Sequence, residues 1–224
     1  MLNTLSSTEE NYLKAIFKLC ERKQKTASTN VIAQLLNTKA ASVTDMLKRL
    51  ADKSLINYMK YKGVTLTNSG RIVATTLIRK HRLWEVFLVD KLDFGWDEVH
   101  DIAEQLEHIQ SDELTNRLES FLNFPKFDPH GDPIPDREGN FQYRQQFLLA
   151  DVKKDEEVIV VGVLEHNTEF LKYLEKLNLI LGTELRIIDT FSYDNSLLVS
   201  MNKNQEQTLS AKVAKNIFVQ KINS

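Results

Sequence analysis

Two histidine–carboxylate clusters on neighbouring predicted helices constrain this chain more than any other feature. They are His81-x-x-x-Glu85 and His100-x-x-x-Glu104-x-x-Glu107-His108. Helical residues three or four positions apart share one face, so each run forms a stripe of imidazoles and carboxylates. A divalent cation is a suitable partner for such nitrogen and oxygen donors on a face that otherwise packs. The spacing therefore predicts a metal site. The alternative is a solvated acidic helix face, because Asp97, Glu98 and Asp101 crowd the second run.

Charge is distributed unevenly along a chain whose formal net charge is only -2. Residues 1–82 carry 15 Lys and Arg against 5 Asp and Glu, whereas residues 83–224 carry 14 against 26. A basic first part followed by an acidic second part indicates that the first part meets a polyanion. Nucleic acid is the favoured polyanion, because no basic amphipathic segment with an exposed aromatic face points to a membrane surface.

Length and composition are those of an ordinary globular protein with two or three small domains. Cys20 is the single cysteine, which excludes an intrachain disulfide, and it falls in register with Leu13, Ile16 and Phe17 as a core residue would. The start of the chain lacks a secretory signal pattern, and no apolar run approaches the length of a membrane span. We therefore expect a cytoplasmic protein that makes no contact with a membrane.

The first 70 residues have the pattern of a winged helix-turn-helix domain. Hydroxyl and acidic residues from Ser6 to Glu10 can start one helix, Thr29 can cap a second, and a third runs from Ala40 to Lys53 after a three-residue turn. Alternating residues at 55–67 then predict a hairpin with basic residues at its tip. The third helix would enter the major groove of DNA. The candidate DNA-contacting residues are Thr29, Lys39, Ala41, Ser42, Thr44, Asp45, Lys48, Lys60 and Lys62.

The middle of the chain is expected to be helical and to form a dimer. Its predicted helices span residues 69–91, 97–109 and 111–121. Trp84, Phe87 and Leu88 could bury an apolar face between two copies of the chain. All four prolines then fall within residues 125–135, which marks a boundary.

The last part of the chain has a β pattern. Strands are predicted at 158–164, 185–190, 197–201 and 216–222, with one helix at 168–177. Several short strands with one small helix indicate an SH3-like barrel. The expected fold class is therefore α+β. Its parts are a winged-helix DNA-binding domain at 1–70, a helical metal-binding and dimerisation domain at 71–136, a linker at 137–150 and an SH3-like domain at 151–224.

Several motifs, in their order and spacing, resemble the diphtheria toxin repressor family of metal-dependent transcriptional regulators. They are Thr8-Glu9-Glu10-Asn11-Tyr12-Leu13, Leu66-Thr67-x-x-Gly70, Arg79-Lys80-His81-Arg82-Leu83-x-Glu85, Val99-His100-Asp101, Glu107-His108 and Pro129-His130-Gly131-Asp132-Pro133-Ile134-Pro135. The resemblance is close over residues 1–136 and weaker over the C-terminal barrel. The family has iron-responsive and manganese-responsive branches.

The resemblance implies two metal sites per subunit. The primary site would use Asn11, Glu104, Glu107 and His108, and the ancillary site would use His81, Glu85, His100, His166 and Glu169. Some positions depart from the family pattern. Asn11 replaces a methionine or an aspartate, and Lys14 stands where two-domain manganese sensors have a carboxylate, which argues against their dinuclear site. His130 is expected to be a turn residue, and His166 a loop residue if it is not a ligand.

The function implied is that of a metal-activated repressor of metal-uptake genes, not of an enzyme. The protein would bind double-stranded operator DNA as a homodimer. Oxygen ligands at Glu104 and Asn11 favour Mn²⁺, and Fe²⁺ remains an alternative because histidines supply nitrogen. Two other functions stay open. One is a metal-independent winged-helix regulator whose barrel binds a ligand or partner, and the other is a metal-dependent hydrolase.

Overall fold

The computed structural model describes residues 5–22, 26–59, 62–202 and 205–222. The contacts divide the chain into two compact units. The first unit comprises Met1–Trp84, Ala103–Leu118 and Ile134–Phe141, and the second comprises Glu85–Ile102, Glu119–Pro133 and Gln142–Ser224. Three helices contribute residues to both units: α4 (Asn68–Leu92), α5 (Val99–Leu106) and α6 (Asp112–Phe121).

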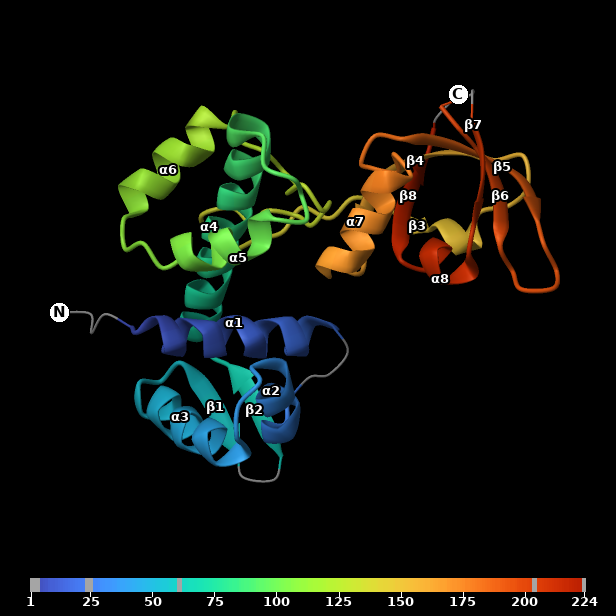
Figure 1. Cartoon of the computed structure of the whole chain (residues 1–224). Coiled ribbons are helices and arrows are strands. Elements are labelled where there is room, and N and C mark those ends of the chain that lie inside the picture. Colours follow the sequence, from blue (N-terminus) through green and yellow to red (C-terminus); the bar gives the residue numbers. More distant parts are fainter. Residues whose placement is uncertain (1–4, 23–25, 60–61, 203–204, 223–224) are drawn as a thin grey trace. The chain divides into compact units, whose positions relative to one another are not determined.

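The first unit contains a winged helix-turn-helix domain (Figure 1). Its elements are α1 (Ser7–Arg22), α2 (Thr29–Leu35), α3 (Ala40–Asp52), β1 (Ile56–Met59) and β2 (Gly63–Leu66). The two strands pair antiparallel, and Ala27 adds a short bridge to Val64. Helix α3 buries Val43, Leu47 and Leu50 at helical spacing in the core of this domain. The expected helix-turn-helix and hairpin are thus confirmed.

The helices of this domain begin at side-chain caps. Ser6 and Glu9 form a capping box on α1, in which the Glu9 carboxylate accepts the Ser6 N–H at 2.9 Å and the Ser6 hydroxyl accepts the Glu9 N–H at 3.3 Å. The prediction that Thr29 caps the second helix is wrong. Ser28 is the cap, because its hydroxyl accepts the Val31 N–H at 3.3 Å while its backbone is extended.

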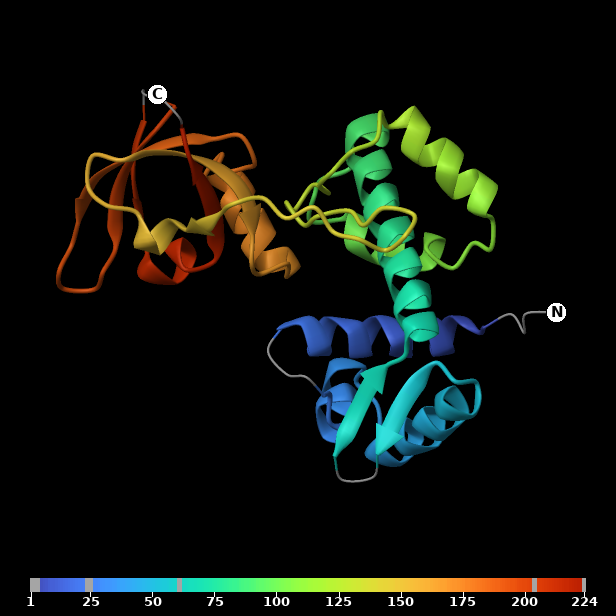
Figure 2. The same ribbon diagram turned by 180° about the vertical axis from the view of Figure 1, so that it is seen from behind.

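The second unit is built on a six-stranded antiparallel sheet in the order β3-β8-β4-β5-β6-β7. Its strands are β3 (Phe147–Leu148), β4 (Glu157–Val163), β5 (Glu184–Thr190), β6 (Leu197–Met201), β7 (Gln205–Leu209) and β8 (Ile217–Lys221). Two helices, α7 (Thr168–Lys176) and α8 (Ala211–Ala214), and a 3-10 turn at Leu149–Asp151 complete the unit (Figure 2). Alternate strand residues such as Leu185, Ile187 and Val199 fill its core.

Several predicted bounds need correction. The predicted helix at 97–109 ends at Leu106, so Glu107 and His108 lie in the turn after α5 and not on its face. Two further backbone bonds follow the helix, from the Glu107 N–H to the Ala103 carbonyl at 2.9 Å and from the Ile109 N–H to the Leu106 carbonyl at 3.2 Å. Strands β3 and β7 and helix α8 were not predicted. Strand β3 falls inside the stretch expected as a linker, where Phe147 pairs with Val219.

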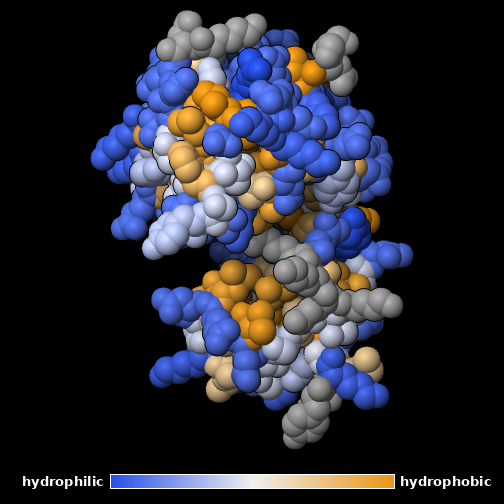
Figure 3. All heavy atoms as spheres, turned by 90° about the vertical axis from the view of Figure 1, so that its right-hand side faces the viewer, coloured by the Kyte–Doolittle hydropathy of each residue, from blue (hydrophilic) through white to orange (hydrophobic). Residues whose placement is uncertain are grey.

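The surface is mixed in polarity. On the face drawn in Figure 3, hydrophobic residues form patches among hydrophilic ones. Within the described ranges, no helix has both the length and the apolar character that crossing a bilayer requires.

Candidate metal centres

The first unit brings charged side chains from α1 and from the end of α5 into one cluster, of which Lys14 and Glu107 are buried and the Glu104 side chain is 37% exposed. The ammonium group of Lys14 lies 2.7 Å from Glu104 Oε1, 2.8 Å from Glu107 Oε1 and 2.6 Å from Glu107 Oε2. Lys14 is only 5% exposed and Glu107 is fully buried. We call Lys14, Glu104 and Glu107 the Lys14 cluster.

Two histidines flank the Lys14 cluster. His81 Nδ1 lies 2.6 Å from Glu107 Oε2, and His108 Nδ1 lies 2.6 Å from Glu10 Oε2. At His108 this short contact is a hydrogen bond and requires a hydrogen on the nitrogen, whereas the contact of His81 Nδ1 does not have hydrogen-bond geometry among the described residues. His108 therefore donates from Nδ1 to Glu10 and turns Nε2 towards Glu107, 3.8 Å from Oε1.

The fourth residue of the predicted primary site, Asn11, has a different environment. Its Oδ1 atom is buried and accepts no hydrogen bond within the part of the chain that the structure describes. Asn11 also lines a hollow between α1, the turn after α2 and α3, beside Thr38, Ser42 and Arg49. Coordination by Asn11 stays a prediction.

The second unit contains another buried cluster, formed by Glu85, Asp128 and His130. One ligand atom from each of these residues lies within 4.8 Å of the other two. All three side chains are buried, with residue exposures of 2%, 4% and 2%. Two carboxylates and an imidazole are suitable donors for Mn²⁺, Fe²⁺ or Zn²⁺. We call these three residues the His130 cluster.

Backbone groups hold the His130 cluster in place. His130 donates from Nε2 to the Trp96 carbonyl at 2.7 Å, which leaves Nδ1 facing Glu85 Oε2 at 3.7 Å. Asp128 Oδ1 accepts the N–H groups of His130 and Asp132 at 2.9 and 3.0 Å. Metal-binding histidines commonly donate their second N–H to a carbonyl in this way, because it fixes the ring and the tautomer. The donor set and its orientation thus fit a divalent cation.

The charges around His130 are also those of a cation site. Burial alone would lower the pKa of His130, but the neighbouring carboxylates of Glu85 and Asp128 and the Trp96 carbonyl raise it to about 9. The cluster therefore stabilises positive charge at the imidazole. A divalent metal ion would supply two positive charges to the two carboxylates in place of the single charge of the imidazolium.

The predicted ancillary ligands are distributed over both units. His81 belongs to the first unit, and Glu85, His100, His166 and Glu169 belong to the second. His100 Nδ1 lies 3.5 Å from Glu85 Oε1. Grouping His81 with these residues stays a prediction.

The two predicted ligands from the barrel differ in their surroundings. The imidazole of His166 stacks on that of His130 with ring centroids 5.0 Å apart, and its Nε2 lies 3.2 Å from the Val163 carbonyl. Burial lowers the pKa of His166, so the ring is neutral and suited to bind a cation. Glu169 is exposed in the first turn of α7.

Asp128 and His130 were not among the predicted ligands. The sequence did carry a signal, because an aspartate and a histidine two positions apart in a proline-rich turn can both face one ion. That turn depends on Gly131, whose φ of 90° suits glycine and whose position leaves no room for a Cβ against the Val161 carbonyl.

The candidate DNA-contacting residues lie on and before α3. Lys39, Ala41, Ser42, Asp45 and Lys48 are exposed, whereas the Thr44 hydroxyl donates to the Ala40 carbonyl within the helix at 3.0 Å. Thr29 opens α2, and Lys62 is exposed just before β2. Lys60 lies outside the described residues. Contact with DNA by these residues stays a prediction.

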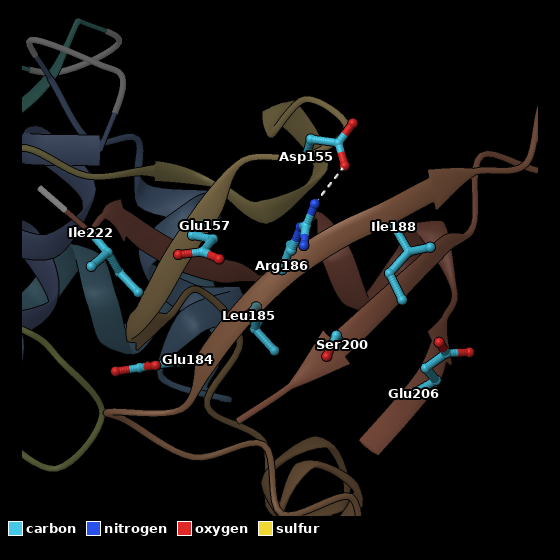
Figure 4. Close-up of a pocket in the computed structure, with 9 residues that line it drawn as sticks. All are labelled: Asp155, Glu157, Glu184, Leu185, Arg186, Ile188, Ser200, Glu206 and Ile222. Carbon is cyan, nitrogen blue, oxygen red and sulfur yellow. Dashed lines mark hydrogen bonds and ion pairs between the residues drawn. The ribbon is translucent and has the colours of Figure 1, made fainter. Parts of the chain in front are cut away.

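A separate pocket lies on the sheet of the second unit (Figure 4). Four carboxylates line it, from Asp155, Glu157, Glu184 and Glu206, and its arginine, Arg186, is bonded to Asp155 at 3.1 Å. Because its charge is net negative, this pocket does not suit a polyanion such as DNA.

Three family models match the chain in succession. Residues 4–64 match the N-terminal DNA-binding domain of iron-dependent repressors, and residues 67–136 match their metal-binding and dimerisation domain. Residues 147–221 match the FeoA domain. The succession follows the expected order of a winged helix, a helical domain and an SH3-like domain.

Individual relatives agree with these models. The iron-dependent repressor IdeR of Mycobacterium tuberculosis is 36% identical over 134 residues, which is 60% of this chain and 58% of IdeR. The diphtheria toxin repressor of Corynebacterium diphtheriae is 34% identical over 134 residues, 60% of this chain and 59% of that repressor. The matched segment thus spans less than two thirds of these curated relatives.

A solved structure matches over a longer stretch. It is described as a manganese-dependent transcriptional repressor in complex with manganese, and it superimposes with a TM-score of 0.82 and 32% identity. The match covers 96% of this chain and all of that one. By its fold and these matches, the chain thus resembles the class of metal-dependent, DNA-binding transcriptional repressors. The chain belongs to the iron-dependent repressor family, which includes IdeR and the diphtheria toxin repressor.

Proposed function

We propose that this protein is a repressor of metal-uptake genes whose affinity for operator DNA depends on a divalent metal ion. The observation that carries the proposal is the His130 cluster, in which two carboxylates and one oriented imidazole are buried together. Such groups are costly to bury unless a cation or hydrogen bonds compensate them. In a family of metal-dependent repressors, binding of that cation would regulate DNA binding.

The His130 cluster and the adjacent His166 come from three separate segments of the chain. Glu85 is on α4, His130 is in the proline-rich turn, and His166 precedes α7 and stacks on His130. A bound metal would supply positive charge to Glu85 and Asp128. The imidazole of His130 would then give up its proton, because both nitrogens cannot hold hydrogens while one binds a metal.

DNA recognition is assigned to α3 and the residues just before it. The exposed positions Ala41 and Ser42 are small enough to let the helix enter a major groove, and Lys39 and Lys48 can neutralise phosphates. A homodimer would place two such helices on half-sites one helical turn apart, about 34 Å. A metal that binds the DNA-competent arrangement more tightly increases the population of that arrangement, and DNA reciprocally tightens metal binding.

Mn²⁺ is the favoured ion and Fe²⁺ the alternative. The donors of the His130 cluster are two carboxylates and an imidazole, with neither thiolate nor thioether among them. Oxygen-rich sets suit hard ions such as Mn²⁺. Zn²⁺ should bind at least as tightly in a test tube, because raw affinity follows the Irving–Williams order.

The proposal is tested by removing donors from the His130 cluster. Operator DNA binding by an Asp128→Asn, His130→Gln double variant is measured by fluorescence anisotropy with and without Mn²⁺. We expect the response to Mn²⁺ to be lost, and we expect Glu175→Gln, an exposed acid on α7 outside every predicted metal site, to behave like the wild type. A double variant that still responds fully to Mn²⁺ would contradict the proposal.

A further inference from the structure

We infer that the ammonium group of Lys14 takes the place of a divalent metal ion in the Lys14 cluster. The cluster then joins α1 of the DNA-binding domain to the end of α5 without any metal. This inference rests on the proposed function and deepens it, because metal control would be confined to the His130 cluster. The site expected from the resemblance would be a permanent internal ion pair.

The ammonium group of Lys14 occupies the position between the carboxylates where a metal ion would bind. Its nitrogen lies between 2.6 and 2.8 Å from three carboxylate oxygens of Glu104 and Glu107. An ammonium group has three hydrogens, and each is matched here by one oxygen. Hard divalent cations need the same oxygens at about 2.0–2.6 Å. A metal and the ammonium group therefore cannot occupy this position together.

Burial makes the ammonium group difficult to displace. Lys14 is 5% exposed, and its neighbours on α1, Leu13 and Ala15, are 0% and 4% exposed, so the base of the side chain is fixed in the core. A divalent ion entering beside it would place like charges close together where water screens them poorly. A metal could bind only after the Lys14 side chain had left the buried position.

The flanking residues have internal partners as well. Glu107 is contacted by His81 in addition to Lys14, and His108 is held by Glu10. Gln110 supports this arrangement by donating to Glu10 Oε1 at 2.8 Å. Asn11, the remaining predicted ligand, contributes no charge. The predicted ligands Glu104, Glu107 and His108 thus each have a partner within the protein.

The inference is tested by counting bound Mn²⁺ per chain by equilibrium dialysis. Lys14→Met removes the charge and shortens the side chain by one atom, and Lys18→Met, one turn further along α1, is the matched control. We expect Lys14→Met to bind one more Mn²⁺ than the wild type, and Lys18→Met to bind the same number as the wild type. An unchanged count in a folded Lys14→Met would overturn the inference.

A second measurement covers the case in which Lys14→Met does not fold. Glu104→Gln is made in the otherwise unaltered chain, where Lys14 remains. If Lys14 occupies the cluster, the count and affinity for Mn²⁺ should not change. A loss of one ion, or a ten- to hundredfold loss of affinity for one, would show that the wild-type cluster binds metal and would overturn the inference.

The same experiments separate the inference from the proposed function. If the wild type binds no Mn²⁺ and Lys14→Met binds one, the proposed function fails and the inference stands. If the wild type binds two ions and Glu104→Gln binds one, the inference fails and metal-dependent regulation stands.

Discussion

The imidazole of His130 donates its Nε2 hydrogen to the carbonyl of Trp96 over 2.7 Å, and the two aromatic rings stack with centroids 6.1 Å apart. This pair determines which nitrogen of His130 faces Glu85. Trp96 is itself packed in the core of the second unit. The orientation of a candidate metal ligand is thus built into the hydrophobic core.

The protonation of His130 predicts how the metal-free protein responds to pH. The neighbouring carboxylates raise the pKa of His130 from 6.5 to about 9. A group whose pKa is higher in the folded state than in the unfolded state stabilises the fold. This contribution is complete at pH values below the pKa of the unfolded state, and it is lost as pH rises through the pKa of the folded state. We therefore expect the free energy of unfolding of the metal-free protein to fall between pH 7 and pH 9, as measured by urea denaturation. His130→Gln should remove most of this pH dependence. If the free energy of unfolding changed with pH equally in the wild type and in His130→Gln, the prediction would be contradicted.

Because His130 is protonated in the metal-free protein, we expect the affinity for metal to increase with pH. Metal binding at His130 must displace a proton that is held up to about pH 9, so the apparent affinity should rise with pH up to that value. Calorimetry with Mn²⁺ in buffers of different ionisation enthalpy would show the released proton. An affinity that does not change between pH 7 and pH 8.5 would contradict proton displacement from His130.

Substitution of Gly131 should disturb the His130 cluster more than an ordinary glycine substitution would. Gly131 and Gly182 have φ values of 90° and 89°, but a Cβ on Gly131 would meet the Val161 carbonyl while one on Gly182 meets nothing within 4 Å. Gly182→Ala should cost about 1 kcal/mol from its backbone alone. Gly131→Ala should cost more than that and should also weaken Mn²⁺ binding. Thermal unfolding and dialysis check both effects, and equal costs for the two variants would contradict the steric argument.

The capping box of α1 predicts an acid-sensitive contribution to stability. Burial opposes ionisation of Glu9, but hydrogen bonds from Lys53 at 2.6 Å and from Ser6 lower the pKa of Glu9 below 4.5. A carboxyl group whose pKa is lower in the folded state stabilises the fold at pH values above its pKa in the unfolded state. This contribution is lost as pH falls through the pKa of the folded state. Glu9→Gln should therefore cost about 1 kcal/mol at pH 7 in urea denaturation, and the difference should shrink below about pH 4.5. A cost that stays constant down to about pH 3 would argue against the ion pair.

A single basic residue before α3 predicts a change in the salt dependence of DNA binding. Lys39 is exposed immediately before α3, where its ammonium group can reach a phosphate. Lys39→Ala should weaken binding and reduce the slope of log affinity against log salt by about 1. Lys176→Ala, an exposed lysine at the end of α7, is the control and should leave the slope unchanged. The same slope for Lys39→Ala as for the wild type would remove Lys39 from the interface.

Long periodic elements were predictable from the sequence, whereas short ones were not. The helix expected at 69–91 is α4 (Asn68–Leu92), because its apolar positions recur over many turns. Strand β7 (Gln205–Leu209) was missed because only Leu209 at its end is buried, which leaves no alternation to detect. Strand β3 has two residues and depends on pairing with β8, a partner distant in sequence.

The candidate site was predictable only in part, because local sequence patterns do not show contacts between residues distant in sequence. Histidine and carboxylate spacing within one helix identified Glu85 and Glu104. The contact between Lys14 and Glu107 joins residues 93 positions apart, and before folding Lys14 resembles any lysine on an amphipathic helix. Burial of His130 depends on Trp96, 34 positions away. Such long-range contacts arise from packing, which local patterns do not encode.

The most direct test of the central claim is binding of the purified metal-free protein to promoter DNA of metal-uptake genes from its own genome. Mn²⁺, Fe²⁺ under anaerobic conditions and Zn²⁺ are titrated separately at fixed salt, with anisotropy of labelled DNA as the signal. We predict tight binding only when metal is present. Equal affinity with and without each metal would contradict the account and would favour a regulator that does not respond to metal.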